Sequence, residues 1–327
     1  KIYEALQLCH GWADHNDTTP LQHIIHDSRN IQSLTNNIIW NIFADQEHNI
    51  WLGTDYGISL SRYNSALQFI PISQITGTGD GNQFYSLFRD SKGFYWFGGA
   101  NGLIRFTDPA GERHDAIWYR MGDKTYPLSH NRIRHIYEDK EQQLWIATDG
   151  SINRYDYATR QFIHYNIVDN TGTYNTNWTY YIFEDTAGQL WISTCLGGIF
   201  VVDKHKLMQS TSGQYIAEQN YSVHNGLSGM FINQIIPDNE GNVWVLLYNN
   251  KGIDKINPRT REVTKLFADE LTGEKSPNYL LCDEDGLLWV GFHGGVMRIN
   301  PKDESQQSIS FGSFSNNERS EERRVGK

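Results

Sequence analysis

Several residue types and motifs are scarce in this sequence, and each scarcity excludes certain classes of protein or partner. The three cysteines, Cys9, Cys195 and Cys282, are too few and too widely spaced for a disulfide framework or a zinc signature, so we expect small buried apolar side chains. No stretch approaches the roughly 18 consecutive apolar residues of a membrane-spanning helix. Positive charge is also in deficit: 28 Lys and Arg stand against 38 Asp and Glu, a net charge of -10. This balance argues against nucleic acid or an anionic membrane surface as a partner.

Motifs of catalysis are missing as well. The sequence contains no G-x-S-x-G, H-E-x-x-H or phosphate-binding P-loop pattern. His130 and His135 flank Arg132 and Arg134, but no cysteine or serine–acid pairing is suggested nearby, so both histidines are expected to be structural or exposed. We therefore predict no catalytic residue, no metal site and no cofactor.

What the sequence does contain is a repeat. Six tryptophans follow one another at intervals of 45, 49, 46, 53 and 45 residues, and an aspartate stands six residues before each of them. A period of this length is typical of propellers and other repeat architectures. The aspartate and tryptophan pairs are Asp45 and Trp51, Asp90 and Trp96, Asp139 and Trp145, Asp185 and Trp191, Asp238 and Trp244, and Asp283 and Trp289.

Each repeat carries four short strand candidates separated by Gly, Asn and Asp. In the first repeat these are Ile38–Ala44, Ile50–Gly53, Ile58–Tyr63 and Leu67–Ile70. Four antiparallel strands in about 45 residues form one blade of a β-propeller. The sequence thus predicts an all-β propeller with six complete four-stranded antiparallel blades and an incomplete seventh.

The predicted boundaries follow from these spacings. Residues 1–35 would form a linker and the outer strand of the incomplete blade, at Leu21–Ile25. Residues 36–314 would form the six blades, with Ser308–Phe311 pairing inside its own blade, and 315–327 a tail. Residues 319–327 resemble a translated sequencing adapter, so we expect the natural continuation to be missing. The six blades are expected at about 36–75, 82–122, 131–170, 177–224, 230–270 and 277–314.

The recurring residues have structural roles in such a blade. An aspartate at the end of the first strand can accept hydrogen bonds from backbone amides of the following turn. Glycine recurs in that turn at Gly93, Gly188, Gly241 and Gly286, where a positive φ is needed. A tryptophan on the second strand would pack between neighbouring sheets. A calcium loop is the alternative, but no turn has the ligand spacing of an EF-hand.

The repeat resembles the two-component regulator propeller repeat. Its end reads glycine, then arginine and an aromatic residue, as in Gly102 with Arg105-Phe106 and Gly150 with Arg154-Tyr155. The resemblance implies the periplasmic sensor region of a hybrid histidine kinase from Bacteroidetes, of a type commonly tied to polysaccharide use. It also implies partners: the rest of the same kinase and a second copy.

One position in each repeat suggests a ligand site. Five residues before each aspartate, at the start of the innermost strand, stand residues that we call the rim residues: Trp40, Tyr85, Arg134, Tyr180, Asn233 and Asn278. With neighbouring Arg132 and Trp178 they would bring aromatic faces, cations and amides to one mouth, a mixture that suits an oligosaccharide. Arg134 and Arg132 could meet an acidic group of a uronate or sulfated glycan. The alternative is that these residues only pack between blades.

Three functions remain open at this stage. The chain could be a sensor propeller that binds a glycan fragment and passes the signal to a kinase. It could instead be a protein-interaction or dimerisation platform without its own ligand. It could also be a lyase or hydrolase, because a propeller fold does not fix function.

Overall fold

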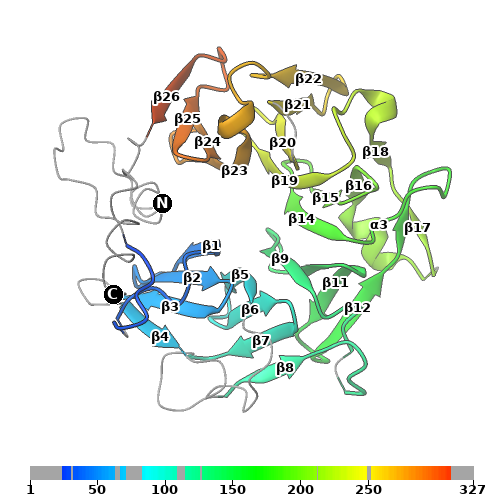
Figure 1. Cartoon of the computed structure of the whole chain (residues 1–327). Coiled ribbons are helices and arrows are strands. Elements are labelled where there is room, and N and C mark those ends of the chain that lie inside the picture. Colours follow the sequence, from blue (N-terminus) through cyan, green and yellow to red (C-terminus); the bar gives the residue numbers. More distant parts are fainter. Residues whose placement is uncertain are drawn as a thin grey trace, which may run out of the picture. The chain divides into compact units, whose positions relative to one another are not determined.

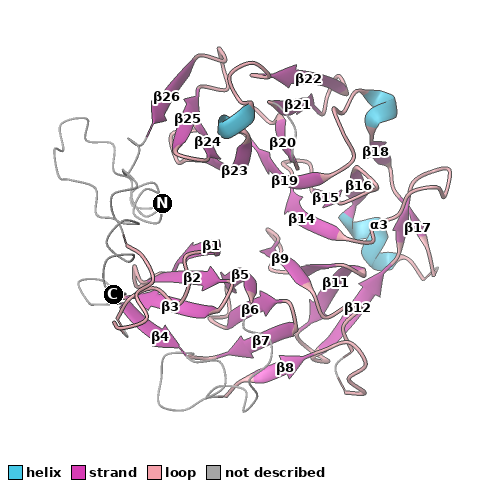
Figure 2. Ribbon diagram, in the orientation of Figure 1, coloured by secondary structure: helices cyan, strands magenta, loops and turns pink. Residues whose placement is uncertain are grey.

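The computed structural model describes residues 24–30, 32–62, 67–70, 83–108, 115–125, 127–211, 213–248 and 252–310. The described chain divides into two compact units. Unit 1 contains the described residues up to Ser222 together with Met230–Asn233, and unit 2 contains Val223–Gly229 and the described residues from Gln234 onward. Strands dominate both units, and helices are few and short among these residues (Figure 2).

Unit 1 holds four four-stranded antiparallel sheets, which we call blades 1 to 4 (Figure 1). Blade 1 consists of β1 (Ile39–Ala44), β2 (Ile50–Thr54), β3 (Gly57–Ser61) and β4 (Leu67–Ile70). Blade 2 consists of β5 (Phe84–Arg89), β6 (Tyr95–Gly99), β7 (Gly102–Phe106) and β8 (Ile117–Tyr119). Blade 3 consists of β9 (Ile133–Glu138), β10 (Leu144–Thr148), β11 (Ser151–Asp156) and β12 (Gln161–Tyr165).

Blade 4 carries the longest excursion from the repeat. It consists of β14 (Thr179–Glu184), β15 (Gln189–Thr194), β16 (Ile199–Asp203) and β18 (Gln219–Tyr221). The helix α3 (Lys204–Gln209) follows β16, with Asp203 as its N-cap. The two-residue strands β13 (Ile167–Val168) and β17 (Tyr215–Ile216) pair in parallel beside it.

Unit 2 holds two more sheets of the same kind, blades 5 and 6, except that Ile232 and Asn233 of blade 5 belong to unit 1. Blade 5 consists of β19 (Ile232–Pro237), β20 (Val243–Leu247), β21 (Ile253–Asn257) and β22 (Glu262–Leu266). Blade 6 consists of β23 (Pro277–Cys282), β24 (Leu288–Phe292), β25 (Gly295–Ile299) and β26 (Gln306–Ser310). Single turns of 3-10 helix lie at η1 (Val223–Asn225) and η2 (Gly273–Lys275). The described chain therefore contains six four-stranded antiparallel blades, which confirms the predicted fold class.

The aspartate and tryptophan of each repeat are joined directly. In all six blades the indole Nε1–H donates to the aspartate Oδ2 at 2.6–2.9 Å. The other oxygen, Oδ1, accepts the backbone N–H four residues further on, which closes the turn. Five of the six indoles are buried and Trp289 is half-buried. The turn role of the aspartate is confirmed, and the indole bond adds a second role that spacing alone did not indicate.

The turn also confirms the expected positive φ. The third residue after each aspartate has φ between 61° and 86°, including the non-glycine residues His48 and Gln142. A side chain with a Cβ is strained in this region, so glycine at the other four positions relieves that strain.

Neighbouring blades of unit 1 pack through these indoles. Trp51 lies 5.3 Å from the ring of Tyr95 and 5.6 Å from that of Phe97, both in the next blade. Trp96 contacts Tyr155 of blade 3 at 4.9 Å. Aromatic pairs of this kind add to the burial of apolar area. The expected position of the tryptophans between sheets is confirmed for these blades.

Polar side chains that are buried or half-buried also tie the innermost strands together. In unit 1 the backbone N–H of Ile136 donates to Ser86 Oγ at 3.0 Å, and that of Ile182 donates to His135 Nδ1 at 3.3 Å. In unit 2 the N–H of Leu280 donates to Gln234 Oε1 at 2.8 Å. His135 thus has a structural role between blades 3 and 4.

Some expectations concern the ends of the chain. β26 pairs with β25 of its own blade, as expected for Ser308 and its neighbours. The outer strand expected at Leu21–Ile25 and the tail expected at 315–327 fall outside the described residues, apart from Ile24 and Ile25. No helix within the described ranges is long and apolar enough to cross a membrane.

Candidate functional site

The rim residues lie where the innermost strands depart from regular pairing. In each described pairing of an innermost strand with its neighbour the register shifts by one residue, and the residue skipped is the rim residue. A β-bulge of this kind bends the strand and re-aims a side chain, and such bulges are common near binding sites. The residues at these shifts are Trp40, Tyr85, Arg134, Tyr180 and Asn278.

In unit 1 the rim side chains of blades 1 to 4 form a continuous row of contacts. The rings of Trp40 and Tyr85 meet edge to face, with centroids 5.3 Å apart. The guanidinium of Arg134 lies 5.7 Å from the ring centroid of Tyr85 and 4.5 Å from that of Tyr180. These distances are within the range of cation–π attraction. The row therefore links blades 1 to 4.

Arg134 is also fixed by a carboxylate. Its Nε donates to Asp149 Oδ1 at 2.8 Å and its Nη2 to Oδ2 at 3.3 Å, a bidentate pair. The Asp149 side chain is only 8% exposed and that of Arg134 19%, so water screens this pair weakly. Arg132 approaches the same carboxylate at 3.7 Å and is 45% exposed. One buried carboxylate thus faces two guanidinium groups.

A second polar group occupies the blade 1 end of the row. Asp55 accepts a hydrogen bond from the indole of Trp40 at 3.2 Å and one from the Gln83 amide at 2.8 Å. The hydroxyl of Tyr85 donates to Gln83 at 2.8 Å. The ring of Trp40 remains about half exposed. This end offers an indole surface beside a carboxylate.

Trp178 lies beside the row with an unusual backbone. Its φ is 56°, in the left-handed region where a bulky residue is uncommon. Its N–H donates to the carbonyl of Asp149 at 3.0 Å, and its carbonyl accepts the N–H of Cys195 at 2.9 Å. Its side chain is nonetheless 49% exposed. The backbone of Trp178 is therefore held between blades 3 and 4 while its indole faces solvent.

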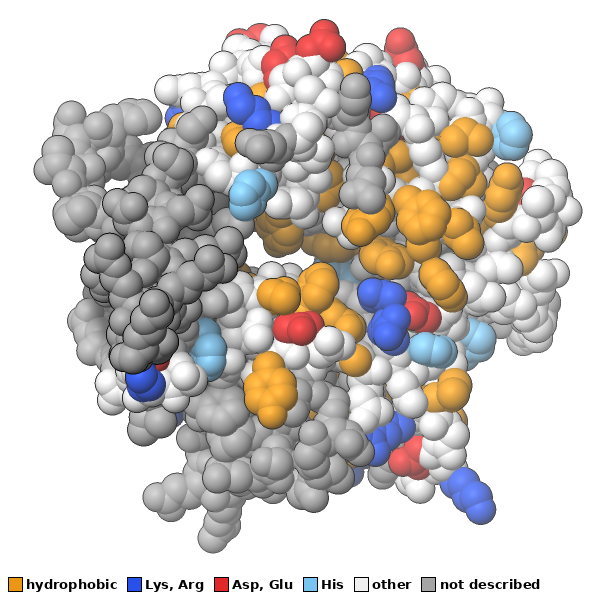
Figure 3. Space-filling model, in the orientation of Figure 1, with side chains coloured by type: hydrophobic (Ala, Val, Ile, Leu, Met, Phe, Trp, Pro, Cys, Tyr) orange, Lys and Arg blue, Asp and Glu red, His pale blue; other side chains and the backbone are white. Residues whose placement is uncertain are grey.

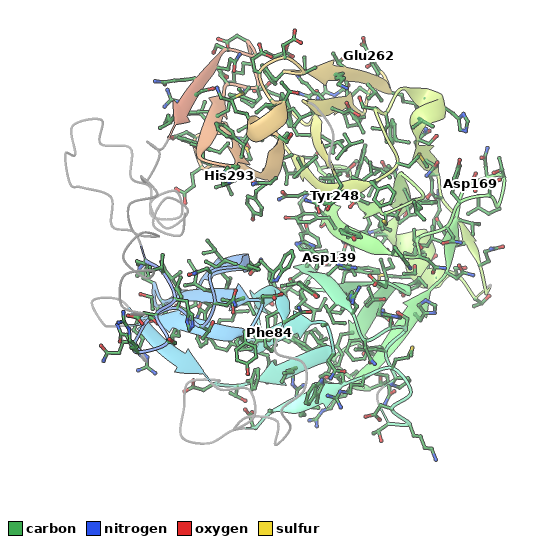
Figure 4. All side chains as sticks on the ribbon, viewed as in Figure 1. Phe84, Asp139, Asp169, Tyr248, Glu262 and His293 are labelled. Atoms are coloured by element: carbon green, nitrogen blue, oxygen red, sulfur yellow. The ribbon has the colours of Figure 1, made fainter. Side chains whose placement is uncertain are left out.

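The remaining two rim residues are placed differently. Asn233 is half-buried, and Asn278 is exposed at the bulge of β23 in unit 2. In the same unit, Tyr248 and His293 follow the tryptophan strands β20 and β24 and are labelled in Figure 4. The row of ring contacts described above is thus a feature of unit 1.

Burial changes the titration of groups near the row. Desolvation lowers the pKa of His135 to about 3, so its imidazole is neutral and Nδ1 is free to accept a hydrogen bond. Burial also raises the pKa of the Cys195 thiol and of the Tyr180 hydroxyl. None of these groups carries charge near neutral pH, which leaves Asp55, Asp149, Arg132 and Arg134 to set the electrostatics of the row.

Figure 3 shows this part of the surface. Basic and acidic side chains lie next to one another over β9, and hydrophobic side chains lie beside them. Figure 4 shows Phe84, at the start of β5, among the side chains that pack between blades. No group of three or more His, Cys, Asp or Glu side chains in the described part of the chain is arranged to hold a metal ion.

Asp55 and Asp149 were not among the residues expected from the sequence. Both stand four residues after the repeat tryptophan, and the N–H of each pairs with the carbonyl two residues before the rim residue. The signal that could have found them is this fixed offset, because the turn after the tryptophan strand lies beside the start of the innermost strand.

Comparison with known families finds a match to part of the chain. The family described as "Two component regulator propeller" matches residues 33–56, 78–101 and 127–150, which cover the tryptophan phrase of the first three repeats. No curated protein matches the chain.

Solved structures from B. thetaiotaomicron are similar over most of the chain. Two are described as the extracellular domain of BT4673, termed a putative one-component system in one case and a putative hybrid two-component system in the other. They share 98% and 99% identity, with TM-scores of 0.73 and 0.74, and each match covers 92% of this chain. This chain spans only 40% of the length of those structures.

More distant structures share the fold alone. The extracellular domain of the putative hybrid two-component system BT3049 from B. thetaiotaomicron is 20% identical, with a TM-score of 0.68 over 86% of this chain and 35% of its own length. Virginiamycin B lyase from Staphylococcus aureus is 15% identical, with a TM-score of 0.61 over 84% of each chain.

Proposed function

We propose that this chain, which carries two-component regulator propeller repeats, is an extracytoplasmic sensor module of a hybrid two-component signalling protein. On this proposal it lies in the periplasm, binds a glycan-derived ligand on the row of rim side chains, and passes binding on to a kinase. The near-identical solved structures described as extracellular domains support the location and the signalling context. This chain spans 40% of the length of those structures. We therefore include the kinase and a second copy of the protein in the proposal, as partners that the signalling context implies.

The observation that carries the ligand proposal is the row in unit 1. A half-exposed indole, Trp40, stands at one end of a fixed set of rings, carboxylates and guanidinium groups, and the backbone of a second half-exposed tryptophan, Trp178, is bonded to Asp149 of this set. Sugar rings stack their apolar faces on indoles, and their hydroxyls bond to charged groups held in place. The side chains are fixed before a ligand arrives, which lowers the entropic cost of binding.

Isothermal titration calorimetry of the full chain against neutral and acidic oligosaccharides tests this proposal. We expect at least one saccharide to bind, and Trp40→Ala to weaken that binding at least tenfold. The matched control is Glu284→Gln, an exposed residue of the hairpin turn in blade 6. Binding that both variants retain would contradict the proposed location, and no binding by any saccharide would contradict the ligand role.

A protein-interaction platform is the second candidate. Tyr56 and Leu196, in the turns after the tryptophan strands of blades 1 and 4, are 61% and 56% exposed. Exposed apolar side chains of this size are common at protein contacts. Under this alternative, Leu196→Asp would abolish self-association in light scattering, and saccharides would not bind.

The proposal assigns no reaction to the chain. The structures that share most of its sequence are described as extracellular domains of signalling systems, and the lyase from Staphylococcus aureus resembles it in fold alone.

A further inference from the structure

Charge is unevenly distributed around Asp149. Arg134 engages both carboxylate oxygens, and its guanidinium lies near the rings of two tyrosines, so most of its bonding capacity is used. Arg132 reaches only Oδ2, at 3.7 Å, which is too long for a hydrogen bond. The group formed by Asp149, Arg134 and Arg132, which we call the triad, therefore has one positive charge in excess. Arg132, with 45% of its side chain exposed, presents this uncompensated charge to solvent.

The backbone of Arg132 is nevertheless well defined. Its N–H donates to Nδ1 of His130 at 3.0 Å, and its carbonyl accepts the N–H of Asp149 at 3.3 Å. The carbonyl of Asp149 in turn accepts the N–H of Trp178. Arg132 and Trp178 are thus each joined to Asp149 by one backbone hydrogen bond.

Trp178 supplies an independent observation. A left-handed φ of 56° is unfavourable for a large side chain, and strain of this kind is concentrated at functional sites. Glycine or asparagine would fit this backbone with less strain, yet the position carries an indole that leaves about half of its surface in solvent. The strained backbone thus holds a half-exposed indole on a residue that is bonded to Asp149, the carboxylate that Arg132 approaches.

We infer that Arg132 and Trp178 form a subsite for a sugar ring that carries a carboxylate, a uronate. The indole stacks on the face of the ring, and the planar guanidinium fork of Arg132 pairs with the planar carboxylate. Arg134 is a positioning residue that neutralises Asp149 and keeps it from capturing Arg132. This inference rests on the proposed function and names the ligand class of the same site.

The net charge of -10 does not oppose such a ligand. Exposed charges further apart than the Debye length of about 8 Å at physiological salt are largely screened. The charges next to the carboxylate of the ligand therefore decide its binding. Within the triad, the uncompensated charge is that of Arg132.

Calorimetric titration of the full chain with oligogalacturonate, oligoglucuronate, sulfated disaccharides and the matching neutral hexose oligomers tests the inference. We expect a uronate oligomer to bind at least tenfold more tightly than its neutral counterpart, and added NaCl to weaken that binding. Arg132→Gln should remove the preference for uronate. Arg160→Gln, an exposed arginine in the turn between β11 and β12, is the matched control.

The indole is tested separately with Trp178→Gly, because glycine keeps the left-handed backbone, and the melting temperature is measured alongside to check the fold. We expect at least a tenfold loss of uronate affinity and an unchanged dependence on NaCl. If neutral oligomers bind as tightly as uronate oligomers, and if Arg132→Gln does not change either affinity, the uronate subsite is overturned. The sensor proposal is not affected by that result. Preference for the sulfated sugars would overturn it too, and failure of every saccharide to bind would overturn both.

Discussion

At the scale of single residues, the repeat aspartate performs two tasks with its two oxygens. Oδ1 closes the hairpin turn and Oδ2 anchors the indole of the tryptophan six residues later. In blade 2, Asp90 Oδ2 also accepts the hydroxyl of Tyr157 from blade 3 at 2.7 Å. One carboxylate therefore joins a turn, a strand and the neighbouring blade.

Replacing Asp90 by asparagine should destabilise unit 1. The amide NH2 group would face two donors, the indole of Trp96 and the hydroxyl of Tyr157, which would lose their acceptor. Leaving buried donors unsatisfied costs about 1–3 kcal/mol each, so we expect a loss of about 2–6 kcal/mol for the two donors. Urea unfolding measures this change. The control is Asp269→Asn, at an exposed site, and equal stability of the two variants would contradict the role of Oδ2.

His135 gives the protein a specific acid sensitivity. Its pKa is about 3 in the folded chain and about 6.5 when unfolded. As pH falls below about 6.5 the unfolded chain takes up a proton that the folded chain refuses. The stability linked to His135 is therefore complete above that pH and declines down to about pH 3.

The variant His135→Gln tests this linkage. Glutamine can still accept the N–H of Ile182, as Gln234 accepts that of Leu280 in unit 2, but it does not titrate. Between pH 7.5 and 5 the variant should lose about 2 kcal/mol less stability than the parent protein. Unfolding curves at both pH values give the difference. Parallel pH profiles for the two proteins would show that His135 is not the group responsible.

At the scale of elements, two of the hairpin turns carry removable strain. Gln142 has φ of 62° at the position where glycine stands in blades 2, 4, 5 and 6. Gln142→Gly should raise the unfolding free energy by about 1 kcal/mol, because glycine adopts this conformation without the cost of a Cβ. Gln142→Ala keeps the Cβ and serves as the control. A thermal midpoint for Gln142→Gly at or below that of Gln142→Ala would argue against this strain.

A buried ion cluster joins blades 3 and 4. Nζ of Lys204, at the start of α3, lies 2.8 Å from Glu184 and 3.2 Å from Asp139, and the Lys204 side chain is fully buried. Removing one partner of such a cluster leaves an unpaired buried charge.

Lys204→Met should therefore cost about 3–5 kcal/mol, as breaking buried pairs usually does. The double variant Lys204→Met with Glu184→Gln should recover part of that loss, because one unpaired carboxylate is removed. Lys206→Met, at an exposed lysine of the same helix, is the control in denaturant unfolding. Strictly additive losses in the double variant would contradict the coupling.

The blades were predictable from the sequence because their marks recur at fixed offsets. The aspartate and tryptophan pair, of which Asp139 and Trp145 are one example, occurs six times in the sequence. An indole buried beside a capped turn is compatible with few folds. The bulge at Arg134 was not predictable, because a shift of one residue in strand pairing changes no residue type. The partner Asp149 and the strained φ of Trp178 depend on contacts between blades, which residue spacing within one repeat does not reveal.

At the scale of the whole molecule, each blade has two ends with different tasks. The hairpin turns at one end carry the repeated aspartates and bonds that hold blades together, such as Lys140 N–H to Glu184 at 2.9 Å. The rim residues and the turns after the tryptophan strands carry residue types that differ from blade to blade. Variable positions on a rigid scaffold are where proteins usually place binding.

Hydrogen–deuterium exchange of the full chain, with and without a saccharide that binds it, tests this division most directly. The account predicts slower exchange on binding at the rim of unit 1, in residues 38–41, 83–86, 130–135, 149–150 and 178–180. The hairpin turns at 45–49, 90–94, 139–143 and 185–189 should exchange as before. Protection confined to those hairpin turns, with the rim unchanged, would contradict the account.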